Sequence, residues 1–392
     1  MANVSSSNGL EKRPKLRFPG FDEPYKQCRI GDIYAERSQR GASDMELLSV
    51  TMNDGVMPRS EIEGKDNSSE DKSNYKVVLT GDMVYNSMRM WQGANGISPC
   101  DGIVSPAYTV LMPKIPISNG YFAAFFKSPN LINEFRKNSQ GMTSDTWNLK
   151  YPQIETIKVC IPALSEQNRV ADMLRTLERR IAKQAQLVDN LKKYKRGVLS
   201  VAFGKYGSIC SWQTTPYPFA ELASRRSEKY DPRSSEQMPC VELEHIEQET
   251  GRIIGSIPST QQNSIKGVCK SGDTLFGKLR PYLRKYAFVK KDMVCSSEIW
   301  SLVPSETIIP EYLFYLVQTD EFIKIANISS GTKMPRAEWS NVEKSVFSVP
   351  NKEIQAQIVQ TLRGLDSRML DAIDMLGELH LMKEGLLQQL FI

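Results

Sequence analysis

The sequence predicts an α+β fold in which two mixed α/β domains alternate with two long helices that pair as an antiparallel coiled coil. Three observations predict this fold. Residues 162–203 are repeated as residues 350–391, both copies hold apolar residues at helical spacing, and short apolar runs between turn residues precede each copy. The repeat implies a pseudo-two-fold arrangement of two similar units.

The composition is that of an ordinary globular protein. Hydrophobic residues make up 40% of the 392 residues and charged residues 24%, and the net charge is +5. No stretch approaches the ~20 apolar residues that cross a bilayer, and residues 1–20 lack the apolar core of a signal peptide, so we expect a cytoplasmic protein. The mild positive charge is compatible with an anionic partner but is not sufficient evidence for one.

Cysteine and histidine usage argues against a metal site. The seven cysteines are scattered and no two form a C-x-x-C pair, which disfavours a zinc ribbon and a disulfide framework. Only two histidines are present, His245 and His380, so a three-histidine site is excluded. We expect no bound metal and interpret the cysteines as small buried apolar residues.

The duplication is specific. Residues 162–203 and 350–391 align without a gap, and chance similarity between amphipathic helices would not also match individual polar landmarks. Upstream the match is looser, with Gly81-Asp82 opposite Gly272-Asp273. We infer that the globular parts carry differing specificities and the helices a common architecture. The matched landmarks are Pro162 with Pro350, Gln167 with Gln355, Lys195 with Lys383 and Phe203 with Phe391.

Each long helix contains a heptad seam. At 1.5 Å per residue, a helix of this length extends ~60 Å, too far to be covered by one small domain. The nearest partner is the other helix, whose seam has the same length and phase, and a pseudo-two-fold axis makes the pair antiparallel. The residues predicted to pair the helices are Leu174, Leu177, Ile181, Val188 and Leu191 in the first and Leu362, Leu365, Met369, Leu376 and Leu379 in the second.

Lys195 and Lys383 occupy the same seam position in the two helices. A polar seam residue costs stability but can fix the register of a coiled coil. Alternatively, both lysines lie near a frayed helix end and extend their charged groups to water. The sequence leaves these two interpretations open.

These patterns divide the chain into five parts. The predicted parts are a disordered N-terminus (1–12), a first domain (13–161), a first long helix (162–204), a second domain (205–349) and a second long helix (350–392). The first domain is expected to hold strands at 46–51, 75–79, 83–85 and 104–112, a loop at 54–74 and a helix at 120–137. In the second domain we expect strands at 240–246, 274–279, 286–289 and 299–303 and a helix at 310–325. Extended segments at 157–162 and 346–350 lead into the long helices.

The sequence contains no motif with all the residues that a catalytic site of its kind needs. Gly272–Leu279 approaches a nucleotide-binding P-loop, but Leu279 stands where Ser or Thr would hold magnesium, and Pro281 interrupts the helix that should follow. No G-x-G cofactor loop, nuclease motif or nucleophile–base arrangement is present. The sequence is therefore predicted to be non-catalytic.

Cations interleaved with aromatic rings indicate nucleic-acid contact instead. Arg and Lys neutralise phosphates or read guanine edges, and Asn reads adenine. For any single residue a solvated surface position remains the better interpretation, whereas the cluster as a whole favours DNA. The candidates in the second domain are Lys278, Arg280, Tyr282, Arg284, Lys285, Lys333 and Arg336, and those in the first are Arg89, Trp91, Thr143, Asn148 and Lys150.

Several segments, spread over nearly the whole chain, together resemble the specificity subunits of type I restriction–modification systems. The motifs that carry the resemblance are Arg13–Phe21, Pro162–Gln167, Val241–Ile246 with Glu249–Gly251, Leu275–Lys285 and Ser330–Arg336. Two departures are present: Ile354 stands where the first copy has Glu166, and Tyr25 stands where the family often has Trp.

The resemblance implies two target-recognition domains, each of which reads one half of a split, asymmetric site in double-stranded DNA. It implies that the helices bind two methyltransferase subunits and that restriction/translocase subunits join this core. The chain itself needs no cofactor under this interpretation, because S-adenosylmethionine, ATP and Mg²⁺ are used by the partner subunits.

Two other readings of the sequence remain. The chain is alternatively the recognition subunit of a related system in which methylase and nuclease are fused in one partner. From a different class, it is a helical adaptor that binds proteins and not DNA. Steep salt dependence of DNA binding would separate the DNA-binding readings from the adaptor.

Overall fold

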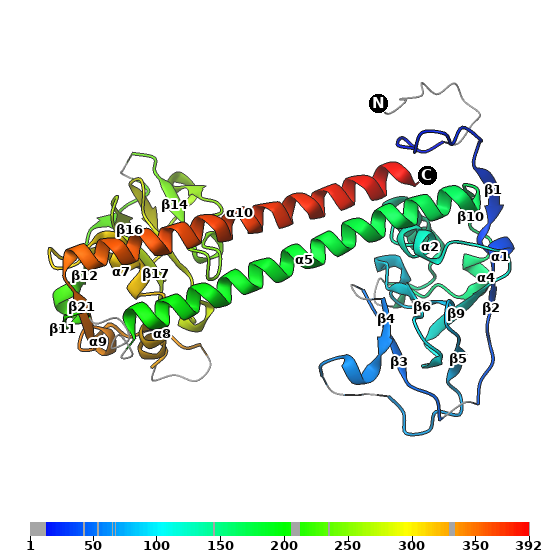
Figure 1. Ribbon diagram of the computed structural model, residues 1–392, viewed down its shortest axis with the longest axis horizontal. Helices are drawn as coiled ribbons and strands as arrows, with labels where there is room; N and C mark the ends of the chain where they lie inside the picture. The colour runs from blue at the N-terminus through cyan, green and yellow to red at the C-terminus, as the bar shows by residue number, and fades with distance from the viewer. Residues whose placement is uncertain are drawn as a thin grey trace. The chain divides into compact units, whose positions relative to one another are not determined.

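The computed structural model describes residues 13–41, 44–52, 55–64, 66, 68–143, 146–204, 212–233, 236–328 and 334–391 (Figure 1). The predicted disorder of residues 1–12 lies outside them. The chain divides into two compact units. Unit 1 holds Met1–Lys183 with Leu376–Ile392, and unit 2 holds Gln184–Met375. Each unit therefore contains one globular domain and a part of each long helix.

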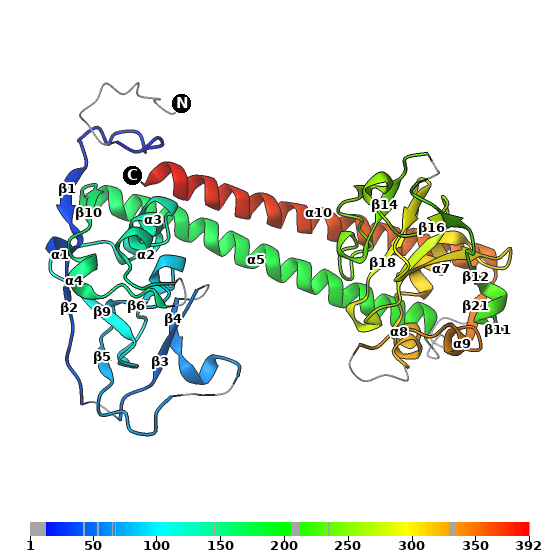
Figure 2. The ribbon, with the colours of Figure 1, turned by 180° about the vertical axis from the view of Figure 1, so that it is seen from behind.

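The two long helices are α5 (Leu164–Phe203) and α10 (Lys352–Leu390). Within each unit their segments run side by side and antiparallel (Figures 1 and 2). In unit 2, for example, Gln184 Nε2 donates to the carbonyl of Ala372 at 2.9 Å. The described helices include none that is long and apolar enough to cross a membrane. All ten residues predicted to pair the helices are buried or half-buried.

A buried glutamine attaches each long helix to its domain. Gln167 Oε1 accepts from the Ser118 amide at 3.0 Å, and its Nε2 donates to the Pro162 carbonyl at 3.0 Å. Gln355 makes the equivalent bonds in unit 2, accepting from the Ile309 amide at 2.8 Å and donating to the carbonyl of the proline before its helix at 2.9 Å. Buried polar groups need hydrogen-bond partners, and each glutamine finds them in its own domain and in the proline before its helix. The matched Pro and Gln residues therefore form the same attachment of helix to domain in both units.

Unit 2 is built on three sheets, with strand orders β12-β20-β17-β18, β13-β16-β19-β14-β15 and β11-β21. Its helices are α6 (Phe219–Leu222), α7 (Pro310–Leu316), α8 (Asp320–Ala326) and α9 (Trp339–Val342). Its strands are β11 (Thr214–Pro218), β12 (Ala223–Arg225), β13 (Lys229–Tyr230), β14 (Pro239–Val241), β15 (Ile257–Pro258), β16 (Lys266–Cys269), β17 (Thr274–Gly277), β18 (Tyr286–Phe288), β19 (Met293–Cys295), β20 (Ile299–Pro304) and β21 (Val346–Pro350).

Unit 1 has the sheets β2-β9-β6-β7, β1-β10, β3-β4 and β5-β8. Its helices are α1 (Ile30–Ile33), α2 (Asn119–Phe125), α3 (Pro129–Asn138) and α4 (Tyr151–Ile154). Its strands are β1 (Lys26–Arg29), β2 (Tyr34–Glu36), β3 (Leu48–Thr51), β4 (Gly55–Pro58), β5 (Lys76–Val78), β6 (Met83–Asn86), β7 (Asn95–Ile97), β8 (Gly102–Val104), β9 (Tyr108–Pro113) and β10 (Lys158–Ile161).

The two four-stranded sheets share one frame. Each Gly-Asp pair forms the turn before its central strand, with Gly81 at φ 92° and Gly272 at φ 94°, where glycine avoids the Cβ penalty. The aspartate then pairs with an arginine after the first strand of the sheet: Arg37 Nε lies 2.6 Å from Asp82, and Arg226 Nε lies 2.7 Å from Asp273. The looser upstream match in the sequence therefore reflects a common topology.

Several predicted elements are divided or shorter than expected, and one strand was not expected. The single helices expected at 120–137 and 310–325 are each two helices. Pro129 begins α3 because its preceding residue is held extended, and the Thr319 side chain caps α8 by accepting from the Phe322 amide. The strand expected at 104–112 is likewise two strands, and the one expected at 240–246 ends at Val241. Strand β4 lies in the segment expected to be a loop.

The seam lysines make cross-helix ion pairs. Lys195 Nζ lies 2.5 Å from Asp366 in unit 2, where burial lowers the pKa of the lysine while the aspartate opposes that effect. Lys383 Nζ lies 2.9 Å from Glu178 in unit 1, at a more exposed site. Glu178 and Asp366 are matched positions of the repeat, so one ion pair is made once in each unit. This geometry favours register fixing over extension of the lysines to water.

Within unit 1, the segment before β1 bonds to both long helices. Arg17 Nε and Nη2 each lie 2.8 Å from a Glu166 oxygen in the first turn of α5, and the Tyr25 hydroxyl donates to the same carboxylate at 3.2 Å. The Leu16 amide donates to the Gln389 carbonyl of α10 at 3.0 Å. Glu166 is buried, and the matched residue of the repeat in unit 2 is the apolar Ile354.

We predict that Arg17→Met destabilises the protein by about 3 kcal/mol, because removing one partner of a buried ion pair leaves the Glu166 carboxylate unpaired. The matched control is Arg175→Met, whose Asp172 partner is 61% exposed, so a loss below about 1 kcal/mol is expected. Urea unfolding followed by circular dichroism measures both. Equal effects of the two substitutions would contradict the buried pairing.

Candidate nucleic-acid interface

The candidate residues of unit 2 gather on a strained turn. We call Lys278–Tyr286, which joins β17 to β18, the basic turn. Its centre is a 3-10 turn at Pro281–Leu283, and Arg280 and Arg284 on either side have φ of 51° and 50°. Left-handed backbone at residues other than glycine costs about 1–3 kcal/mol each and clusters at functional sites. The Arg280 amide donates to the Pro335 carbonyl at 2.8 Å, which fixes the turn.

The turn separates exposed from internally bonded side chains. Arg280 is exposed, and Tyr282 is 51% exposed. Arg284 is instead bonded within the protein: it donates to the Gln318 carbonyl at 3.1 Å and pairs with Asp320. Lys285 Nζ donates to the Leu243 carbonyl at 2.7 Å. The first two are therefore better placed to meet a ligand than the last two.

One further candidate, Arg336, lies on the segment beside the basic turn. The Arg336 side chain is 58% exposed and meets Glu298 at 3.2 Å. The Ala337 amide donates to the Lys278 carbonyl at 2.8 Å, so this segment and the basic turn are held together. Lys333 lies outside the described residues.

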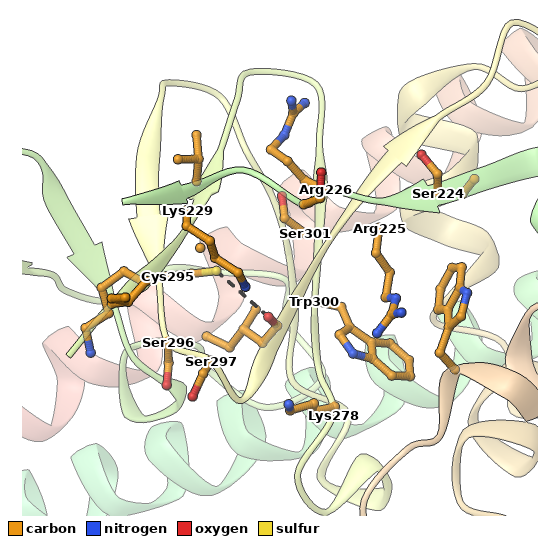
Figure 3. A pocket seen from close by; sticks show the side chains of 18 of the residues that line it. Ser224, Arg225, Arg226, Lys229, Lys278, Cys295, Ser296, Ser297, Trp300 and Ser301 are labelled. Atoms are coloured by element: carbon orange, nitrogen blue, oxygen red, sulfur yellow. Dashed lines mark hydrogen bonds between the residues drawn. The ribbon is translucent and has the colours of Figure 1, made fainter. Parts of the chain in front are cut away.

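A cavity of 610 Å³ opens beside Lys278 (Figure 3). Two tryptophans form one wall, with Trp300 and Trp339 rings 5.5 Å apart and nearly perpendicular. The Arg225 guanidinium lies 4.9 Å from the Trp339 ring centre, a cation–π distance. Figure 3 also shows Lys229 among the residues that line the cavity. The basic turn and this cavity together present cations beside flat rings.

The cavity is electropositive because part of its charge is not neutralised. Arg226 is paired with Asp273, which raises the pKa of the arginine. Lys266 pairs with Glu242 at 2.7 Å; burial opposes ionisation of Glu242, but the hydrogen bonds it accepts, from Lys266 above all, leave its pKa lowered. For the remaining cations Arg225, Lys229 and Lys278, no carboxylate among the described residues lies within ion-pair distance. Such a cavity attracts an anionic ligand.

Unit 1 carries a different set of groups on the same frame. The Leu149 amide donates to the Ser87 carbonyl at 2.8 Å, the counterpart of the bond between Ala337 and Lys278. This link brings the segment with Asn148 and Lys150 beside the one with Arg89 and Trp91. Arg89, Thr143 and Lys150 are exposed, and Asn148 is half-buried with an unbonded Oδ1.

Trp91 is part of an aromatic cluster in unit 1. Its ring lies 5.2 Å from that of Trp147, and the Arg136 guanidinium lies 5.5 Å from the Trp147 ring. Neither Trp147 nor Arg136 was a sequence candidate, although Trp147 directly precedes Asn148. Around the cavity of unit 2, the sequence candidates likewise did not include Arg225, Trp300 and Trp339. The adjacent cations Arg225-Arg226 were the one local pattern that could have pointed to this site.

Strand register identifies the matched positions of the two units. Glu36 pairs with Leu111 and Arg225 with Leu302, and those partners occupy equivalent positions opposite the central strand. Glu36 therefore stands where Arg225 does, and by the same register Thr109 stands where Trp300 does. Tyr151 takes the place of Trp339. The two domains therefore place different side chains at matched positions of one fold. In the described parts of the chain, no cluster of metal-ligating residues is present.

The two units share one fold, and each carries a different set of cations and aromatic rings on it. Residues 220–373 match the family model of the type I restriction modification DNA specificity domain. The match covers the second domain and part of the second long helix, and it agrees with the family that the sequence motifs resemble.

Characterised relatives agree with the match. The HindI specificity subunit of Haemophilus influenzae is 32% identical over 32% of this chain and 28% of its own length. The EcoDI specificity subunit of Escherichia coli is 23% identical over 60% of each chain. This chain thus spans about a quarter and three-fifths of those two relatives. The MjaVIII specificity subunit of Methanocaldococcus jannaschii is 23% identical over 75% of this chain and 76% of its own.

Solved structures share the fold. A chain of a type I R-M system, studied for its complex assembly and conformational transition, has a TM-score of 0.59 at 13% identity, over 95% of this chain and 98% of its own. The type I S subunit from M. genitalium has a TM-score of 0.56 at 13% identity, over 97% of this chain and 99% of its own. These likenesses confirm the predicted arrangement of two α/β domains and two long helices.

We predict that Arg280→Ala weakens binding of double-stranded DNA by about 1–3 kcal/mol if Arg280 reads a base edge. The control is Lys290→Ala, an exposed cation outside the basic turn and the cavity, which should leave affinity within about twofold. Fluorescence anisotropy with the assembled complex measures both. Unchanged affinity and unchanged sequence preference in Arg280→Ala would refute the assignment.

Proposed function

We propose that this protein is the DNA-recognition subunit of a type I restriction–modification complex and that each domain reads one half of a bipartite, asymmetric site. The observation that carries the proposal is the pair of unlike cation–aromatic surfaces on one duplicated frame. Cations beside aromatic rings suit contact with phosphates and bases. Unlike residues at matched positions suit two different half-sites.

The long helices space the two readers and dock two methyltransferase subunits in this proposal. Helices of about 60 Å correspond to one to two turns of B-DNA, whose pitch is about 34 Å. A pseudo-two-fold helix pair offers the same surface twice, which suits two identical partners. Restriction/translocase subunits complete the complex.

In this proposal the partner subunits carry out the reactions of the complex. The methyltransferase subunits use S-adenosylmethionine to modify adenine, and the restriction subunits use ATP and Mg²⁺, while the present chain supplies recognition without a cofactor of its own. Since it recognises cellular DNA in this proposal, we propose the cytoplasm as its compartment.

A salt titration tests the DNA-binding part of the proposal. The logarithm of affinity should fall linearly with the logarithm of salt concentration, with a slope of about −0.9 for each phosphate neutralised. A flat dependence, or no DNA binding by the complex, would favour the helical adaptor. A partner polypeptide carrying both methylase and nuclease would identify the related fused system.

We predict that removing seven residues from each long helix shortens the spacer between half-sites. Both deletions are needed together to preserve pairing, and they shorten the support by about 10 Å, or about three base pairs at 3.4 Å each. Base-resolution mapping of methylated adenines measures the spacer. An unchanged spacer would show that helix length does not set it.

A further inference from the structure

A short turn lies between the basic turn and the long helices of unit 2. We call Glu247–Arg252 the strut turn. It is closed by the bond from the Glu247 amide to the Arg252 carbonyl at 3.0 Å. It is joined to the basic turn through the backbone, because the Glu249 amide donates to the Arg284 carbonyl at 3.0 Å. The proposed function assigns it no role.

Ion pairs attach the strut turn to both long helices. Arg252 makes a bidentate pair with Asp374 of α10, with nitrogen–oxygen distances of 2.6 and 3.1 Å. Glu249 pairs with Arg196 of α5. Bidentate arginine–carboxylate geometry restricts orientation as well as distance, so the turn is held against two helices at once.

On its other side the strut turn holds the basic turn through charge. Glu249 Oε1 lies 3.9 Å from Arg284 Nε, and the same guanidinium pairs with Asp320 of α8. Alternating charges thus form one chain, Arg196–Glu249–Arg284–Asp320. A single exposed pair contributes only about 0.2–1 kcal/mol, whereas a connected network restricts all of its members.

Backbone strain is concentrated in the same place. In the described part of the chain, the residues other than glycine with positive φ are Glu249 (62°), Arg280 and Arg284. Gly251 has φ of 77°, and a Cβ there would come within 2.7 Å of the Phe314 ring. Strained conformations persist only where the surroundings over-determine them.

We propose that the strut turn fixes the orientation of the basic turn relative to the long helices, with Glu249 and Arg252 as positioning residues, and thereby makes the protein strict about the spacer between half-sites. The spacer part rests on the proposed function. The restraint on the basic turn does not, and it is measurable on the protein without DNA.

The test uses the double variant Glu249→Ala/Arg252→Ala in the full chain. The control is Lys270→Ala, which removes an exposed 3.3 Å pair with Glu228 outside both turns. Hydrogen exchange should be at least tenfold faster at the Arg280, Leu283 and Arg284 amides in the double variant and unchanged in the control. If the double variant does not fold, Glu249→Gln replaces it, because it removes the charge and keeps a hydrogen-bonding group of the same size.

The second readout is the set of methylated sites made by the complex. The variant should keep both half-site sequences but accept spacers one base pair longer and shorter, while the wild type and Lys270→Ala accept one spacer. Unchanged exchange at the basic turn overturns the restraint whether or not DNA is bound. Faster exchange with one unaltered spacer overturns the effect on spacing. Absence of bipartite modification by the wild type, with the exchange result intact, refutes the proposed function and the spacer part and leaves the restraint standing.

Discussion

The structure depends on the fact that neither domain completes its core without both long helices. In unit 2, Leu199 of α5 and Ile358 and Leu362 of α10 belong to the same buried cluster as the domain's aromatic residues. In unit 1, Val170 and Leu174 of α5 share a cluster with Leu390 at the end of α10. Because apolar burial dominates folding stability, the antiparallel pairing of the helices is a condition for each domain.

This constraint explains what the two copies keep and what they change. The proline and glutamine before each helix recur because they anchor domain to helix, and the Lys195–Asp366 and Lys383–Glu178 pairs recur because they hold the register. Positions on the sheet surfaces neither anchor a domain to its helix nor fix the helix register. Unlike residues such as Glu36 and Arg225 therefore stand at matched positions, which suits the proposal that each domain reads a different half-site.

Much of this fold was predictable from the sequence. The ungapped repeat gave both helices, their pairing and the shared frame, since heptad spacing over such lengths has few alternatives. The divided helices were not predicted, because the apolar pattern continues across both breaks. A proline decides the break at Ser128-Pro129, and a side-chain cap decides the one at Thr319. The pairing of Arg17 with Glu166 was beyond sequence reasoning because it joins residues far apart in the chain.

The site was predictable as a region and not as a set of contacts. The cation-rich run from Lys278 to Tyr286 was evident, but composition does not distinguish Arg280, which is exposed, from Arg284, which is bonded internally. That difference arises from two left-handed residues and from carbonyl groups supplied by other elements. Arg225 and Trp339 meet only because β12 and α9 fold beside the same cavity, and no local pattern announces this.

The central claim is that one chain carries two unlike readers on a single support. Base-resolution mapping of modified adenines in cells that express this chain with its methyltransferase partner tests it most directly. The account predicts one motif with two different half-sites separated by a fixed number of unread base pairs. A palindromic motif, a single contiguous motif or modification without sequence preference would contradict it.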